Sequence, residues 1–183
     1  MDHELLELYR RASDWTAAKL PGAATKLDAP TTCDGWTVRA LLSHMLDTQR
    51  YFAGVARGED VSPPSPTPPE LVGDDPVQAF ARARSEVLRA FAVPGVIEKT
   101  GPLLGIAFSD QVLHAWDLAA STGQDATMPR GLPEAAYEMI HGRFTDEQRK
   151  GVFKPELASP AEASAQDRLL AYTGRDPSPV VGT

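Results

Sequence analysis

Residues 109–123 read SDQVLHAWDLAASTG, and this stretch decides the fold that the sequence predicts. It has no internal glycine or proline and no run of β-branched residues, and Leu113, Trp116 and Ala120 recur at helical spacing. Gly123 stands where a helix commonly ends. The sequence therefore predicts a largely apolar helix that belongs in a protein core.

Three ionisable residues interrupt the apolar surface of this predicted helix. Asp110 and His114 are four residues apart and leave the same face, and Asp117 follows three residues later on that face. A carboxylate and an imidazole on a buried helix are costly unless a partner compensates for the lost water. They therefore either bind each other or bind an ion.

Further helical segments lie on both sides of this stretch. The apolar spacing and the capping residues predict helices from Asp2 to about Leu20, from Asp34 or Thr37 to about Arg57, from Asp75 to about Phe91, from near Pro133, and from about Ala163 to Tyr172. Pro21 and Gly22 are expected to end the first helix. Asp34 and Thr37 are both suitable caps for the second, and the sequence does not choose between them.

A proline-rich connection separates the second and third predicted helices. Residues 59–74 contain SPPSPTPP, which favours an extended surface segment over a helix or a central strand. No segment alternates with the period of a strand. We therefore expect an all-α four-helix bundle with a long proline-rich crossover and short C-terminal helices. We expect one domain over residues 1–177 and a disordered tail over residues 178–183.

Composition excludes several classes of function. The 183 residues carry a formal net charge of −7, which argues against nucleic acid and anionic membranes as partners. We find neither a membrane-spanning apolar run nor a secretory leader pattern. The single cysteine, Cys33, excludes an internal disulfide and suits a reducing cytoplasm. We expect Cys33 to be a small buried residue; the alternative is a reactive thiol whose pKa is lowered by a nearby helix N-terminus.

A candidate metal site follows from the placement of the histidines. His44 lies beside apolar positions of the second predicted helix, so its side chain points at or near the core. Two histidines and one carboxylate from facing helices, here His44, Asp110 and His114, are a common metal-binding set that leaves coordination positions open. Asp117 would then orient a ligand or pair with an arginine. The alternative is a helical Asp110–His114 pair and a separate core histidine.

Three segments also resemble a known family. These are CDGWTVRALLSH at residues 33–44, DQVLHAWDLAASTGQD at 110–125 and DRLLAYTGRDP at 167–177. They resemble, in the same order, motifs of actinobacterial proteins related to the metal-binding domain of mycothiol-dependent maleylpyruvate isomerase, in the DinB-like superfamily. The resemblance covers nearly the whole chain.

The resemblance implies a ligand set and a class of chemistry. It identifies His44, Asp110 and His114 as ligands of a divalent metal, with zinc first and nickel or iron as alternatives. Two departures stand out: the isomerase has glutamate where this chain has Asp110, and it has an additional C-terminal domain for which we expect no room in 183 residues. The substrate of the isomerase is therefore not carried over.

Three hypotheses on function follow. The first is a cytoplasmic enzyme, a transferase or isomerase, that uses a metal and a small thiol such as mycothiol on an electrophilic small molecule, with Arg39 as a candidate contact for an acidic substrate. The second is a non-catalytic metal-binding sensor, carrier or interaction module. The third is a plain bundle with a structural Asp110–His114 pair. A homodimer is expected only by analogy with related bundles.

Overall fold

The computed structural model describes residues 2–150 and 152–177, with the backbone alone at Asp2 and Asp146. The elements are α1 (Asp2–Ala23), η1 (Ala24–Lys26), α2 (Val38–Arg57), α3 (Pro76–Phe91), α4 (Val96–Thr100), α5 (Leu103–Ser121), α6 (Leu132–Ile140), α7 (Asp146–Lys150) and α8 (Ala165–Tyr172). No strand occurs within these ranges, so the all-α prediction is confirmed. The predicted cap role of the Asp2 side chain and the predicted tail at residues 178–183 lie outside the described part.

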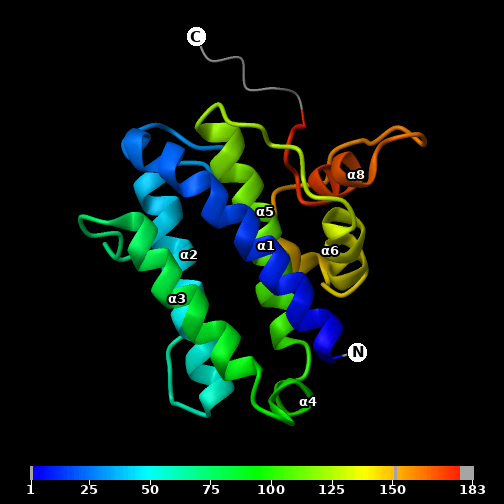
Figure 1. Ribbon diagram of the computed structural model, residues 1–183. Helices are drawn as coiled ribbons and strands as arrows, with labels where there is room; N and C mark the ends of the chain where they lie inside the picture. The colour runs from blue at the N-terminus through cyan, green and yellow to red at the C-terminus, as the bar shows by residue number, and fades with distance from the viewer. Residues whose placement is uncertain (1, 151, 178–183) are drawn as a thin grey trace.

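Four long helices, α1, α2, α3 and α5, form the bundle, and α6 and α8 pack at its side (Figure 1). Helices α1 and α5 run in one direction, while α2 and α3 run in the other (Figure 1). Because α2 and α3 are consecutive and parallel, the chain must return along the bundle between them. The proline-rich crossover makes this return without a helix or strand, as its composition predicts.

Side-chain caps fix where two of the bundle helices begin. Thr37 caps α2 by accepting a hydrogen bond from the amide of Ala40, which decides between the two caps that the sequence allowed. Asp75 caps α3 through the amide of Gln78, and Pro76 occupies the first turn, as predicted. Both helices therefore begin where local sequence chemistry places them.

The first helix does not end at Pro21. Helix α1 continues to Ala23 and is followed directly by η1, so this prediction was wrong. Leu20 and Ala23 are fully buried in the core shared with α2 and α3, which favours continued helix over a turn. The Gln124 side chain also donates to the Lys19 carbonyl. Tertiary packing thus outweighs the local preference of proline to end a helix.

Helix α5 is the central helix of the fold. It packs against α1, α2 and α6, and residues on all of its faces are buried. It begins at Leu103, six residues before the stretch that predicted it, and α4 precedes it. A helix that is apolar on every side is stable only inside a fold. This placement puts the ionisable residues of α5 in the interior of the bundle.

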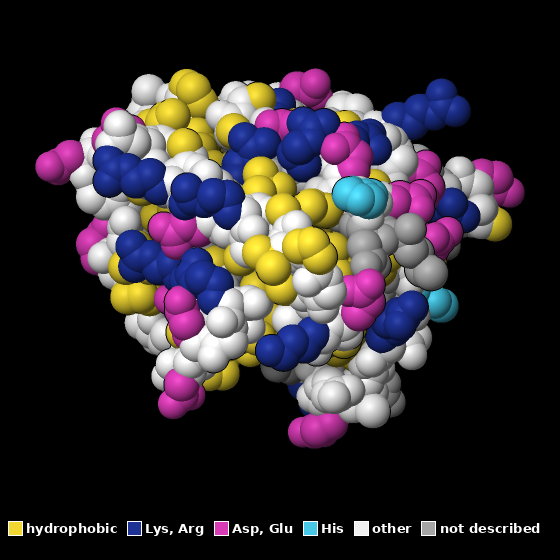
Figure 2. Space-filling view, turned by 60° about the horizontal axis from the view of Figure 1, so that its bottom comes forward, with side chains coloured by type: hydrophobic (Ala, Val, Ile, Leu, Met, Phe, Trp, Pro, Cys, Tyr) yellow, Lys and Arg dark blue, Asp and Glu magenta, His cyan; other side chains and the backbone are white. Residues whose placement is uncertain are grey.

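The end of the bundle that carries α4 exposes a group of hydrophobic side chains bordered by charged ones (Figure 2). Val93 and Ile106 are among the exposed large hydrophobic residues. No helix in the described ranges combines the length and apolarity that crossing a membrane requires.

Candidate metal centre

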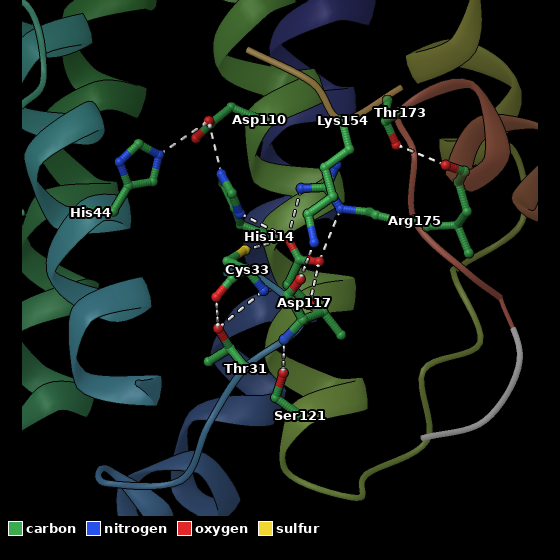
Figure 3. A network of polar contacts seen from close by, with 12 residues as sticks. Thr31, Cys33, His44, Asp110, His114, Asp117, Ser121, Lys154, Thr173 and Arg175 are labelled. Carbon is green, nitrogen blue, oxygen red and sulfur yellow. Dashed lines mark hydrogen bonds and ion pairs between the residues drawn. The ribbon is translucent and has the colours of Figure 1, made fainter. Parts of the chain in front are cut away.

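His44 on α2 faces Asp110 and His114 on α5 (Figure 3). The Nε2 atom of His44 lies 3.7 Å from Oδ1 of Asp110, and Nε2 of His114 lies 3.5 Å from the same oxygen. The two imidazole rings meet edge to face, with centroids 4.8 Å apart. The fold therefore brings together the three side chains that the sequence selected as a metal site.

The spacing of these donors fits a metal ion better than direct hydrogen bonds. Both distances exceed the roughly 2.7–3.2 Å that hydrogen bonds from nitrogen to oxygen usually span. Ligands held at about 2.0–2.2 Å around a tetrahedral ion lie about 3.3–3.6 Å apart. The donor set of two imidazoles and one carboxylate matches zinc and its neighbours in the first transition row. The residues present therefore fit a divalent metal.

Asp117 orients His114. Its Oδ2 atom lies 2.9 Å from Nδ1 of His114, which is one helical turn away. A buried carboxylate accepts the proton of Nδ1, so the lone pair of the histidine is placed on Nε2, the atom that faces Asp110. Asp117 thus contacts one of the candidate ligands directly, and its role beside a metal stays a prediction.

Arg175 anchors Asp117 from the other side. Its Nε donates to Oδ1 at 2.9 Å and its Nη2 donates to Oδ2 at 2.7 Å. The hydroxyl of Thr32 also donates to Oδ1, at 2.7 Å. Burial alone would raise the pKa of Asp117, but the Arg175 guanidinium and the His114 ring together outweigh burial and hold that pKa far below its usual range. Asp117 is therefore a fixed negative charge.

Asp110 and His44 each change the pKa of the other. Burial opposes ionisation of Asp110, but the neighbouring imidazoles, His114 foremost, and the hydroxyl of Thr48 lower its pKa overall. Burial likewise opposes protonation of His44, but the Asp110 carboxylate raises the pKa of His44 above its ordinary value. The site therefore favours a cation next to Asp110, whether a proton on His44 or a metal ion.

Cys33 lies beside the site without being activated. Its Sγ is 3.5 Å from Oδ2 of Asp117, and burial together with that carboxylate raises the pKa of the thiol to about 12. The alternative of a thiol with a lowered pKa was therefore wrong, because burial and a negative neighbour dominate. Cys33, His114 and Asp117 form a second group of close donors. The Asp117 oxygens already accept bonds from Arg175 and Thr32, so this group is the weaker metal candidate.

A tight turn at residues 31–36 holds one wall of the site. The Thr31 amide and hydroxyl both donate to the Trp36 carbonyl, and the Trp36 amide donates to the Cys33 carbonyl. Gly35 has a φ of +75°, which favours glycine at that position. The turn places the Trp36 ring 4.9 Å from the His44 ring and 6.5 Å from the His114 ring. An aromatic side chain therefore covers both histidines.

A cavity of about 690 Å³ opens onto these groups. Its wall combines the turn at 31–36, the crossover at residues 64–66, residues 150 and 152–154, and the C-terminal Thr173 and Arg175. Residue 151 lies outside the described part. The cavity is large enough for a small thiol and a second molecule to meet beside the histidines.

The predicted substrate contact, Arg39, lies elsewhere. Arg39 does not line the cavity, and its guanidinium lies 3.7 Å from Glu70. The arginine that reaches the site is Arg175, which sequence reasoning missed as a site residue although it lies in the third family-like segment. His141 stacks on Tyr137 with ring centroids 4.6 Å apart and belongs to neither group of candidate metal ligands.

Comparisons with known proteins find a matching family and similar relatives. The family model of the mycothiol maleylpyruvate isomerase N-terminal domain matches residues 6–119, which include His44, Asp110 and His114. Two uncharacterized proteins of Mycobacterium tuberculosis, from strains CDC 1551 and H37Rv, are each 31% identical over 186 residues, covering 93% of this chain and 97% of the relative. No solved structure matches the chain significantly.

Proposed function

The chain belongs to the mycothiol maleylpyruvate isomerase N-terminal domain family, and from this premise we propose that it is a metal- and thiol-dependent transferase or isomerase. His44, Asp110 and His114 hold a divalent ion, with zinc first and nickel or iron as alternatives. The family name makes mycothiol the first candidate for the thiol. The substrate is a small electrophile that enters the cavity.

The observation that carries this proposal is that three metal-binding types of side chain, from α2 and α5, converge at one place. Two Nε2 atoms face the same Asp110 oxygen at 3.5 and 3.7 Å, and the Asp117 carboxylate fixes the tautomer of His114. A purely structural pair would place its atoms at hydrogen-bonding distance. The cavity leaves one side of these donor atoms open to other molecules.

The residues around the site have separable tasks. A bound divalent ion lowers the pKa of a coordinated thiol, so that thiolate is available at neutral pH. Asp117 and Arg175 keep His114 in position, and Trp36 shields the histidines from water. In the reaction the sulfur forms a bond to an electrophilic carbon. The displaced electron pair leaves with a leaving group, or moves onto a carbonyl to give an enolate that takes a proton from solvent. The proton released by the thiol enters the solvent. In an isomerase the sulfur is then expelled again, so that the thiol is regenerated.

Elemental analysis of tag-free protein tests this proposal first. We expect about one divalent ion per chain in the wild type and little in the H44A/H114A double variant. The matched control is H141A, which removes an exposed histidine outside the site and keeps its metal. Wild-type protein that stays metal-free after reconstitution with zinc, nickel and iron refutes the metal site. If the protein binds metal but shows no thiol-stimulated turnover of electrophiles, the result supports the second hypothesis, a non-catalytic metal-binding module.

A further inference from the structure

Every cationic side chain that lines the cavity already has a carboxylate partner. Arg175 is held by both oxygens of Asp117. Lys154 Nζ lies 2.8 Å from Asp34 and also donates to the Thr32 carbonyl, and Lys150 Nζ lies 3.2 Å from Glu147. Each of these cations of the described wall therefore has a negative neighbour; the Arg175 pair is largely buried, while both lysine pairs are exposed to solvent.

The charges of the metal ion and the thiol that the proposed function requires also cancel. A divalent ion brings two positive charges to the site; the Asp110 carboxylate supplies one negative charge, and a bound thiolate supplies the other. The remaining carboxylates of the wall, Asp34 and Asp117, are those already paired with Lys154 and Arg175. A carboxylate on the electrophile would then lose its hydrating water in the cavity without gaining a cationic partner, which is unfavourable.

The rest of the wall combines the hydroxyl groups of Thr32, Ser65 and Thr173 with apolar side chains from three separate segments. Trp36 belongs to the turn before α2, Pro64 and Pro66 to the crossover, and Val152 and Phe153 to the segment after α7. Val152 is 60% exposed, so a large apolar side chain stands at the edge of the cavity. Trp36 extends the apolar surface to the His44 ring. Apolar side chains beside a few placed polar groups are typical of sites for small organic molecules, and the apolar side chains here suit an apolar body.

We infer that the electrophile of this site is an uncharged molecule with an apolar, conjugated or aromatic body. This inference rests on the proposed function and names its substrate class. An α,β-unsaturated ketone with a phenyl ring has the required chemistry. The sulfur lone pair forms a bond to the β-carbon, the alkene pair moves onto the carbonyl as an enolate, and a proton from solvent completes the adduct. One thiol and one alkene thus give one thioether, with no change in overall oxidation state.

A matched pair of ligands tests this inference by binding as well as by turnover. The pair is 4-phenyl-3-buten-2-one and the same ketone with a carboxylate para on its ring. Turnover is measured with these two enones. Equilibrium binding is measured by titration calorimetry on the zinc-loaded protein saturated with a small thiol, using the saturated forms of the two ketones, which cannot react with the thiol. We expect the neutral ketone to bind this complex at least about tenfold more tightly, because the bound thiolate completes the charge balance and the carboxylate finds no free cation.

Equal or tighter binding of the carboxylate, or no binding of either ketone, overturns the inference. These outcomes are separable from failure of the proposed function, because metal content and binding of the thiol alone are measured on the same protein. A thiol that binds while neither ketone does refutes the substrate class alone.

Two exposed valines supply matched variants. V152K places a cation at the edge of the cavity, while V77K makes the same change on α3, outside the cavity, where Val77 is also exposed. We expect V152K to reduce the preference for the neutral ketone at least about threefold, by attraction of the carboxylate. V77K should keep the wild-type ratio. An unchanged ratio in V152K also counts against the inference.

Discussion

Arg175 and Asp117 form a two-bond ion pair that joins the C-terminal segment to the central helix. The two residues are 58 positions apart, and their bonds measure 2.9 and 2.7 Å. Asp117 is almost fully buried and in turn contacts Nδ1 of His114. The position of a proposed metal ligand therefore depends on a side chain that lies outside the range matched by the family model.

Removing Arg175 should destabilise the fold and weaken metal binding. R175L leaves the Asp117 carboxylate buried without its main counter-charge, which costs about 3–5 kcal/mol. Urea unfolding of the metal-free protein measures this free energy, and competition with a chelator measures metal affinity. The control is R168L, which removes an exposed arginine of α8 and should leave both quantities nearly unchanged. Equal stability of the two variants contradicts the anchoring role.

Metal affinity should fall as the solution becomes acidic. The Asp110 carboxylate raises the pKa of His44 in the metal-free protein despite burial, so a proton competes with the metal above the ordinary value of 6.5. The stability that this protonation adds to the metal-free fold is fully present below about pH 6.5 and is lost as pH rises through the raised pKa. We expect zinc affinity to decline already between about pH 8 and pH 6.

Chelator competition at a series of pH values measures this decline. H141A serves as the control, because the histidine that it removes lies outside the site and should leave the profile as in the wild type. A zinc affinity that stays constant down to pH values below the ordinary pKa of histidine contradicts the proposed ligand role of His44.

Cys33 should react slowly with alkylating reagents in the folded protein. Burial and the Asp117 carboxylate raise the pKa of its thiol to about 12, so only about one molecule in ten thousand is thiolate at pH 8. Because the chain has one cysteine, iodoacetamide labelling followed by mass spectrometry reports on this residue alone. We expect labelling at least about a hundredfold slower than in the urea-unfolded chain. Comparable rates would mean that Asp117 and burial do not suppress the thiolate.

The sequence predicted the parts of this molecule that depend on local pattern. Helical spacing identified α5, and the i, i+4 relation placed Asp110 and His114 on one face. His44 was found because a histidine among apolar helix positions must point near the core. Pro21 misled the prediction because burial of Leu20 and Ala23 outweighs its local effect. Arg175 was missed as a site residue because it follows the end of α8, where no periodicity indicates direction.

Gly174 joins α8 to Arg175 in a conformation and a space that suit glycine alone. Its φ is +74°, a region that side chains with a Cβ rarely adopt. A methyl group there would lie 2.6 Å from the Pro155 carbonyl oxygen and would also overlap Lys154. The segment after α7 therefore packs directly against the backbone that delivers Arg175 to Asp117.

G174A should therefore destabilise the fold for two reasons, the positive φ and the clash with Pro155. The same substitution at a second glycine separates the two contributions. Gly58 at the end of α2 has a φ of +79°, and an added methyl group there would meet no other atom, so G58A measures the conformational cost alone, about 1 kcal/mol. G174A adds the clash with Pro155, so we expect about 2–4 kcal/mol in urea unfolding. Because the clash moves the backbone beside Arg175, G174A should also weaken zinc binding, whereas G58A should not. Equal effects of the two variants on stability and zinc affinity would show that the Pro155 contact does not position Arg175.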